Sequence, residues 1–146
     1  MKLSIKKLEY DAKVPSYAHG TDAGMDLYYY GPDTMLDCGA QHIFTTGITM
    51  AIPAGFAGLI WDKGGLANKQ GLKVMGGVVD AGYRGQILVG LLNTSQKPAL
   101  IIDGQKIAQM IIQEIHQPEI EVVNGSLLPP AEDERGEGKF GSTGLM

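Results

Sequence analysis

The sequence predicts an all-β domain. Its apolar residues fall in short runs rich in Ile, Val, Thr and Tyr, which are residues that favour strands. Glycine and proline, 21 and 7 of the 146 residues, separate these runs and supply the turns between strands. Many short strands of this kind are typical of a sandwich, a jelly roll or a barrel. The length suits one domain with its own core.

The apolar runs are expected to be strands because they are short and because β-branched or aromatic residues are frequent in them. In KIAQMIIQEI (106–115) the isoleucines would also fit one face of a helix, but the β-branched content and the short length favour a strand. EIEVV (119–123) is expected to be the last strand. The earlier runs are LSI (3–5), MDLYYY (25–30), HIFTTGITMAI (42–52), FAGLIW (56–61), GGVVD (76–80), QILVGLLN (86–93) and ALII (99–102).

One short helix is expected in GLANKQG (65–71), ending at Gly71, because glycine readily adopts the left-handed conformation that ends helices. Beyond residue 123 the composition changes. NGSLLPPAEDE combines two prolines with an acidic run, and RGEGKFGSTGLM (135–146) is rich in glycine. We therefore expect residues 1–123 to form the β-barrel domain and residues 124–146 to form an extended C-terminal arm.

Composition argues against several classes of function. The net charge of −4 gives no general basic field for nucleic acid, and the three histidines lack the spacing of zinc motifs. The single cysteine, Cys38, excludes an internal disulfide and is expected to be a small apolar filler. No apolar run approaches membrane-spanning length, and the first residues lack a signal-peptide pattern. We expect a soluble, cytoplasmic protein that binds neither nucleic acid nor membrane.

The two arginines of the chain lie among glycines, Arg84 in YRG and Arg135 in RGEG. A guanidinium in such a setting can bind phosphate through two hydrogen bonds while backbone amides approach closely, although surface ion pairs would also explain both residues. The C-terminal segment is not a nucleotide-binding P-loop. Gly136 and Gly141 have the required spacing, but no lysine follows Gly141.

Polar residues next to glycine turns recur along the chain. GGVVDAGYRG (76–85) is typical of a β-hairpin that would place Asp80 near Tyr83, and AGMDL and GQKIAQ each bring a polar residue, Asp26 or Gln109, into an apolar strand. Taken singly, each residue has an ordinary structural explanation, such as stabilising a turn or packing on a sheet.

Five segments in order change this assessment: AGMDL (23–27), KGGLANKQGL (63–72), GGVVDAGYRG (76–85), GQKIAQ (104–109) and RGEGKFGSTG (135–144). Together they resemble the five motifs of the trimeric dUTPase family, whose members hydrolyse dUTP to dUMP and pyrophosphate, removing dUTP and supplying dUMP for thymidylate synthesis. The resemblance implies a jelly-roll-like β barrel. It also implies a homotrimer with active sites at subunit interfaces and a swapped C-terminal arm that reaches a neighbouring site.

The resemblance also implies roles for residues of the third motif. Asp80 would be the catalytic carboxylate that orients and deprotonates the attacking water, which then reaches the α-phosphorus in line. Tyr83 would pack against the deoxyribose and leave no room for a ribose 2′-hydroxyl. The backbone at Gly77 would hydrogen-bond the edge of uracil, so that a base with a different donor pattern would leave buried groups unpaired.

For the triphosphate, the resemblance implies a Mg²⁺ ion that bridges the phosphates and is held through waters. Those waters would contact Asp26 and Gln109, so that no direct protein ligand to the metal is expected. Lys63, the backbone of Gly64 and Gly65, and Gln109 would surround the phosphates. In phosphoryl transfer such positioning and charge stabilisation supply most of the catalysis.

The glycine-rich C-terminal segment would act as a lid on the substrate. By the same resemblance, Arg135, Ser142 and Thr143 would contact phosphate. Phe140 would stack on uracil and exclude water, while the glycines, Gly141 among them, would let the backbone close onto the ligand.

The chain departs from the family pattern at several positions. Lys63 and Gly64 stand where Arg-Ser is usual, so the planar guanidinium and a hydroxyl that would meet the departing phosphate are lost. Gln105 and Lys106 stand where Asp-Arg is common, and Lys139 replaces a usual glycine. The missing hydroxyl leaves open a dUTPase-fold regulatory protein that binds nucleotide with weak turnover.

The related dCTP deaminases are a further alternative with the same fold. They need a catalytic glutamate in the strand after the third motif, where this chain has Gly90, and they lack the glycine-rich closing arm. The sequence therefore favours dUTP hydrolysis over deamination.

Overall fold

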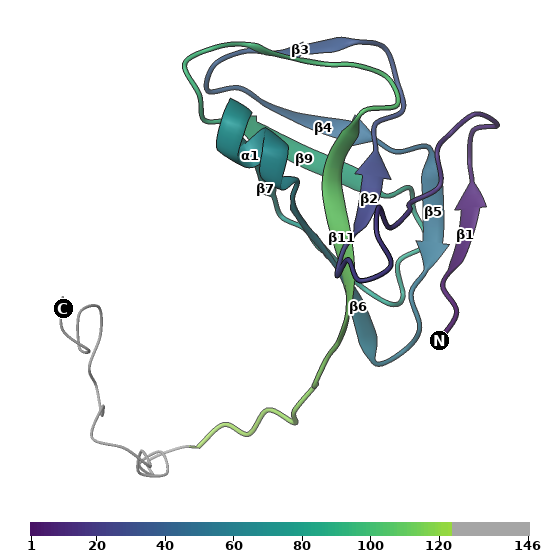
Figure 1. The fold of residues 1–146 in the computed structure, drawn as a ribbon. Helices are drawn as coiled ribbons and strands as arrows, with labels where there is room; N and C mark the ends of the chain where they lie inside the picture. Colours follow the sequence, from purple (N-terminus) through teal and green to yellow (C-terminus); the bar gives the residue numbers. More distant parts are fainter. Residues whose placement is uncertain (124–146) are drawn as a thin grey trace. The chain divides into compact units, whose positions relative to one another are not determined.

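Eleven strands and one short helix make up residues 1–116 in the computed structural model, which describes residues 1–123 (Figure 1). Every pairing between these strands is antiparallel. The all-β prediction is therefore confirmed. Of the described residues, none belongs to a helix with the length and apolar character needed to cross a membrane.

The largest sheet has four strands in the order β2-β11-β6-β8, so that segments distant in sequence lie side by side. Its longest pairing joins β11 to β6, and β11 also pairs with β2 on its other edge. Figure 1 shows β11 crossing in front of β6 with β2 beside it. The strands of this sheet are β2 (Met25–Tyr28), β11 (Lys106–Glu114), β6 (Phe56–Asp62) and β8 (Val78–Val79).

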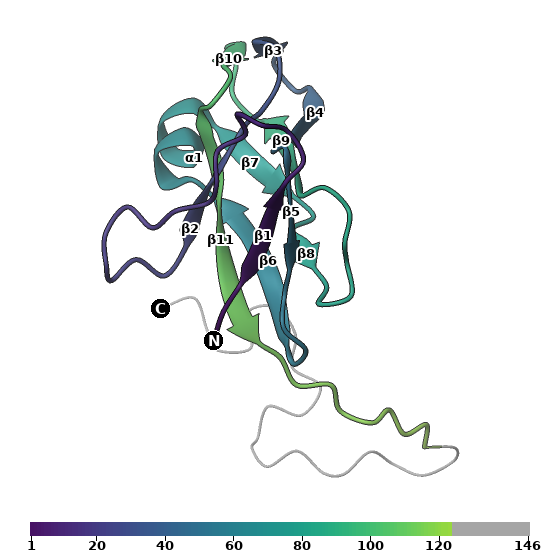
Figure 2. The ribbon, with the colours of Figure 1, turned by 90° about the vertical axis from the view of Figure 1, so that its right-hand side faces the viewer.

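A second sheet and two strand pairs complete the fold. The second sheet has the order β4-β9-β7, and the pairs are β1-β5 and β10-β3. In Figure 2, β3 and β10 lie together at one end of the unit. The strands are β4 (Gln41–Thr45), β9 (Leu88–Asn93), β7 (Leu72–Met75), β1 (Ser4–Lys7), β5 (Ile48–Ala51), β10 (Ala99–Ile101) and β3 (Thr34–Leu36).

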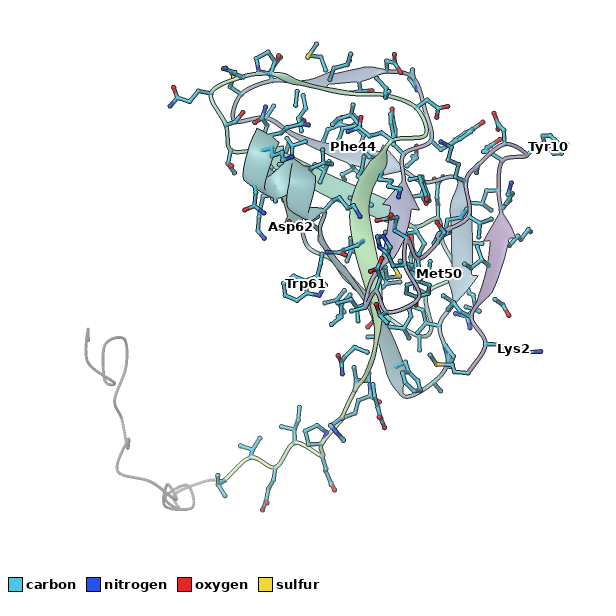
Figure 3. The ribbon with its side chains drawn as sticks, in the orientation of Figure 1. Lys2, Tyr10, Phe44, Met50, Trp61 and Asp62 are labelled. Carbon is cyan, nitrogen blue, oxygen red and sulfur yellow. The ribbon has the colours of Figure 1, made fainter. Side chains whose placement is uncertain are left out.

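Apolar side chains from both sheets meet in one core. Phe44 is fully buried and its ring meets that of Tyr29 edge to face, with the ring centres 5.0 Å apart. Figure 3 shows Phe44 in the interior. Leu27 and Met110 reach the same core from adjacent strands of the four-stranded sheet. The alternation of inward and outward side chains along these strands therefore sets which polar residues remain outside.

The short helix is confirmed, as α1 (Gly64–Gln70). Gly71 ends it with φ of 68°, and the amide of Gly71 donates to the carbonyl of Ala67. The run 42–52 proved to be two strands, because the chain turns at Gly47, where φ is 67°. Strands β3 and β7 were not expected from the sequence, since they are short and mix polar with apolar residues.

Three expectations were wrong. Residues 119–123 are not a strand, because within residues 1–123 no other strand pairs with them. Segment 76–85 is not a hairpin: β8 pairs with β6, and the chain then leaves that sheet, so that the amide of Ile87 donates to the carbonyl of Ile48 in β5. Cys38 is exposed, because it lies in the turn between β3 and β4.

Asn93, at the end of β9, is fully buried and uses both ends of its amide. Its Nδ2 donates to the carbonyls of Leu36 (3.0 Å) and Lys97 (2.8 Å), and its Oδ1 accepts from the amide and hydroxyl of Ser95 at 2.9 and 2.8 Å. The side chain thus ties the end of β9 to β3 and to the turn before β10. A fully satisfied buried amide of this kind rigidifies the structure around it.

We expect Asn93→Asp to lower the free energy of unfolding by about 3 kcal/mol, because a carboxylate cannot donate to the carbonyls of Leu36 and Lys97 and would bury a charge. Urea unfolding followed by circular dichroism, at one protein concentration, would measure the change. Asn68→Asp is the matched control, since Asn68 is exposed and its side chain makes one hydrogen bond, to Gly64. Equal unfolding midpoints for the two variants would contradict this role of Asn93.

Candidate active site

Asp26 on β2 is the only charged side chain that is buried among residues 1–123, with 2% of it exposed. Its Oδ1 accepts a hydrogen bond from Lys63 Nζ. Its Oδ2 lies 2.7 Å from Lys106 Nζ, an ion pair whose angle falls short of a hydrogen bond. With Gln109 these residues form a group that we call the Asp26 cluster: Asp26, Lys63, Lys106 and Gln109.

A bulge in β11 brings two members of the Asp26 cluster onto one face. Lys106 lies opposite Tyr28, but Gln109, three residues later, lies opposite Asp26 because the register shifts between Lys106 and Ala108. In a regular strand, residues three apart point to opposite faces. The bulge therefore turns both Lys106 and Gln109 toward the face that carries Asp26.

Lys63 is positioned by the junction between β6 and α1. Its carbonyl accepts the first two helical hydrogen bonds, from the amides of Leu66 and Ala67, each at 2.9 Å. The amides of Gly64 and Gly65 precede these bonds, in the part of a helix where amides have no helical acceptor. A Cβ added at either glycine would have no neighbour within 4 Å among the described residues, so the space around them is open.

Gln109 is held from two sides. Its Nε2 donates to the carbonyl of Asp62 at 2.9 Å. On the other side the backbone at Gly24 approaches so closely that a Cβ there would lie 2.8 Å from Gln109 Oε1. The Gln109 carbonyl oxygen is therefore directed toward the loop that leads into β2.

The end of β6 is fixed by Asp62 and followed at once by Lys63. Asp62 accepts from the amide of Val74 at 2.7 Å and from Lys73 Nζ. The preceding residue, Trp61, is 52% exposed, and Figure 3 shows its ring projecting from the sheet. Trp61 lies opposite Gln109 in the register of β6 and β11.

The charges of the Asp26 cluster reinforce one another. Burial by itself would raise the pKa of Asp26, but the ammonium groups of Lys106 and Lys63 outweigh that effect and hold the pKa below its usual value. The neighbouring Asp26 carboxylate in turn raises the pKa of Lys106. Around neutral pH the cluster holds one carboxylate and two ammonium groups, so it carries a surplus positive charge that favours an anion.

The other predicted residues lie around the turn that follows β8. The amide of Tyr83 donates to the carbonyl of Asp80 at 3.1 Å, so the expected proximity of these residues is confirmed. Asp80 is exposed, and Tyr83 donates from its hydroxyl to the carbonyl of Gln86 at 2.9 Å. A small open pocket lies beside them, lined by residues that include Val79 and Ile87.

Gly77, just before β8, occupies a position that only glycine can fill. Its φ is 110°, and a Cβ there would lie 2.6 Å from the carbonyl oxygen of Ile60. Its own carbonyl accepts from the amide of Ile60 at 2.7 Å. The bare backbone of Gly77 is therefore pressed against β6.

The described part of one chain does not bring all predicted residues together. It unites Asp26, Lys63 and Gln109 with the glycines that begin α1. Asp80 and Tyr83 follow β8, three strands away from Asp26 in the sheet order, which at about 4.8 Å per strand is a separation of about 14 Å. The five predicted residues of the arm lie outside the described residues: Arg135, Phe140, Gly141, Ser142 and Thr143.

Sequence reasoning did not find the role of Lys106. The signal that could have revealed it is the pair of adjacent apolar residues, Ile107 and Ala108, between polar Lys106 and Gln109. Both apolar side chains are buried, as a bulge allows and a regular strand does not. Trp61 was likewise taken only as part of a strand.

Acid should destabilise the folded chain partly through Asp26. The folded pKa of Asp26 lies below its unfolded value of about 3.9, so its contribution is complete above that pH and is lost as the pH falls through the folded pKa. In Asp26→Asn the part of the stability loss at low pH that comes from protonation of Asp26 should disappear. Stability at pH 7 should nevertheless fall, because both lysines lose their partner. Thermal unfolding between pH 6 and pH 2.5 measures both effects.

The control for this experiment is Asp37→Asn, which removes an exposed carboxylate with no ion pair among residues 1–123. It should keep the acid dependence of the unaltered chain. If Asp26→Asn kept the same dependence as well, the ionised Asp26 would not be a source of stability.

Comparison with known proteins agrees with this site. Residues 10–144 match the family model described as dUTPase. The deoxyuridine 5'-triphosphate nucleotidohydrolase of Clostridium tetani is 43% identical over 144 residues, which cover 97% of this chain and 96% of that protein. The protein of the same name from Mycolicibacterium gilvum is 41% identical over 146 residues, with 97% and 94% covered.

A solved structure is similar over nearly the full length. The dUTPase of Staphylococcus bacteriophage 80alpha, solved with dUpNHpp, matches with a TM-score of 0.85 and 27% identity, and 99% of each chain is covered. The sequence match and the shared fold agree with each other and with the order of the five motifs. The fold is thus the jelly-roll-like barrel of the dUTPases, and the chain belongs to the dUTPase family.

Proposed function

We propose that this chain hydrolyses dUTP to dUMP and pyrophosphate. The observation that carries the proposal is the Asp26 cluster, a buried carboxylate paired with two lysines, of which Lys63 directly precedes the first amides of α1. Such a site attracts and orients a polyphosphate. Its relatives are named as nucleotidohydrolases of deoxyuridine 5'-triphosphate, and the phage 80alpha dUTPase binds dUpNHpp.

Asp80 is the proposed general base. Its carboxylate is exposed beside the pocket that follows β8, where it can accept a proton from water. The resulting hydroxide attacks the α-phosphorus in line, the bond to the bridging oxygen breaks, and pyrophosphate leaves. Lys63 and the amides of Gly64 and Gly65 stabilise the charge on the phosphates.

Selection of the nucleoside is assigned to the residues around β8. The backbone at Gly77 is fixed against β6, where a Cβ would lie 2.6 Å from the carbonyl oxygen of Ile60, and it would hydrogen-bond the edge of uracil. The Tyr83 ring, held by its bond to Gln86, would pack against the deoxyribose. Fixed backbone groups discriminate well because a mismatched base leaves them buried and unpaired.

A complete site requires more than one chain. Asp80 follows β8, three strand positions from β2 and Asp26 within one chain, so we propose that Asp80 of one subunit serves the Asp26 cluster of another in a homotrimer. The arm of residues 124–146 would supply Arg135, Phe140 and the Ser142-Thr143 pair. If different subunits supply Asp80, the Asp26 cluster and the arm, activity would depend on assembly of the trimer.

Residues of the Asp26 cluster fit a magnesium ion that is held through its waters. The Asp26 carboxylate, whose buried Oδ2 is ion-paired with Lys106, and the Gln109 carbonyl oxygen are acceptors of the kind that magnesium-bound water prefers. Bound Mg²⁺ would neutralise charge on the phosphates. Asp26 and Gln109 would then orient the ion without binding it directly.

A regulatory role with weak turnover is the second candidate. Gly64 lacks the hydroxyl that would meet the departing phosphate. This lack favours a chain that binds the nucleotide but releases pyrophosphate slowly. The phage 80alpha protein is described as one of the phage dUTPases that control transfer of virulence genes. Deamination is not proposed, because Gly90 on β9 carries no carboxylate.

A pyrophosphate-release assay with dUTP, dTTP, dCTP and UTP, with and without Mg²⁺, tests the proposal. We expect release from dUTP alone and expect Asp80→Asn to lower kcat by about 10²- to 10⁴-fold, the usual contribution of a general base. Asp37→Asn, the same change at an exposed residue of the turn between β3 and β4, should leave kcat unchanged. Release that was not selective for dUTP, or that survived Asp80→Asn, would rule the proposal out.

Gly64→Ser should raise kcat by about tenfold or more, because it restores a hydroxyl donor and because loss of one such donor typically costs about 10²-fold. A Cβ at this position meets no described atom within 4 Å, so serine fits without strain. Steady-state kinetics on dUTP measure the change. Gly20→Ser, at an equally open position outside the site, should have no effect. An unchanged or lower kcat in Gly64→Ser would show that the missing hydroxyl does not limit turnover.

A further inference from the structure

We infer that Lys106 is a positioning residue that holds Asp26 in place, so that Lys63 can leave Asp26 and bind the phosphates. This inference rests on the proposed function. It divides the two lysines of the Asp26 cluster into one that stays with the carboxylate and one that is exchanged. Neither role is evident from their similar charge.

The charge balance of the cluster provides the first argument. A buried carboxylate is costly without a counter-ion, but one ammonium group is enough to balance it. Asp26 is 2% exposed and contacts two ammonium groups, that of Lys63 at Oδ1 and that of Lys106 at Oδ2. One lysine is therefore available to an incoming anion, provided that the other remains.

The location of each lysine shows which one remains. Lys106 is in β11, which is paired with β2, and the bulge turns its side chain toward Asp26. Lys63 directly precedes Gly64 and Gly65, the first residues of α1, where an added Cβ would meet no described atom within 4 Å. A phosphate at the start of α1 would draw Lys63 from Asp26, whereas Lys106 lies on the strand that pairs with the strand of Asp26.

The exchange also explains how Asp26 could serve two purposes. In the free chain its Oδ1 accepts from Lys63 and is not available to another donor of comparable strength. Departure of Lys63 frees this oxygen to accept a hydrogen bond from a water of the magnesium ion. Lys106 keeps the carboxylate compensated throughout, without itself touching the substrate.

A cycle of binding measurements tests this role. Dissociation constants for dUpNHpp with Mg²⁺ would be measured by calorimetry for the unaltered chain, Lys106→Met, Asp26→Asn and the double variant. Lys106→Met should weaken binding about tenfold, because Lys63 must then stay with Asp26. In the Asp26→Asn background the same change should have less than about a twofold effect, because Lys63 is no longer required there.

Several outcomes would overturn the inference. An equal loss in both backgrounds would mean that Lys106 binds the nucleotide directly. Lys106→Arg, which keeps the charge, should restore most of the affinity, and its failure to do so would also count against an ion-pair role. Lys97→Met is the control, because Lys97 is exposed and makes no ion pair among the described residues.

A measurement on the free chain separates this inference from the proposed function. Thermal unfolding of the same four proteins without ligand should show coupling, with Lys106→Met lowering Tm in the unaltered chain more than in Asp26→Asn. Additive shifts would refute the Asp26–Lys106 link even if the chain hydrolyses dUTP. Failure of the unaltered chain to bind dUpNHpp would instead refute the proposed function, and with it the exchange of Lys63.

Discussion

The cost of burying one carboxylate governs the arrangement of this site. Asp26 lies between two buried apolar residues of β2, and it can remain ionised there because two ammonium groups reach it from different segments. Those segments, the end of β6 and the start of β11, are distant in sequence but adjacent in the sheet. The requirement to compensate Asp26 therefore links the first, second and fourth motifs, and the fold and the site depend on the same contacts.

Much of the fold could be predicted from the sequence because local patterns determine it. Short β-branched runs identified most strands, and Gly71 identified the end of the helix. The exceptions show where local pattern is insufficient. Residues 119–123 have strand-like composition but no partner within the described chain, and β8 pairs with β6 rather than with the segment that follows it. Pairing is a property of the whole fold, so composition alone did not predict it.

The candidate site could be predicted only in part for a similar reason. The order of five motifs identified Asp26, Lys63, Gln109 and Asp80, but it carried no information on distance. The structure joins the first three and places Asp80 after β8, three strand positions from β2 and Asp26. Lys106 was noted only as a departure from the family pattern, because its function depends on a one-residue shift in register that turns it and Gln109 to the same face.

Trp61 has a practical consequence. It is the only tryptophan in the sequence, it is 52% exposed, and it lies across the strand pair from Gln109. The chain thus carries its single tryptophan next to the Asp26 cluster. Since indole emission shifts when water is displaced from the ring, events at the cluster are accessible to stopped-flow fluorescence without any added dye.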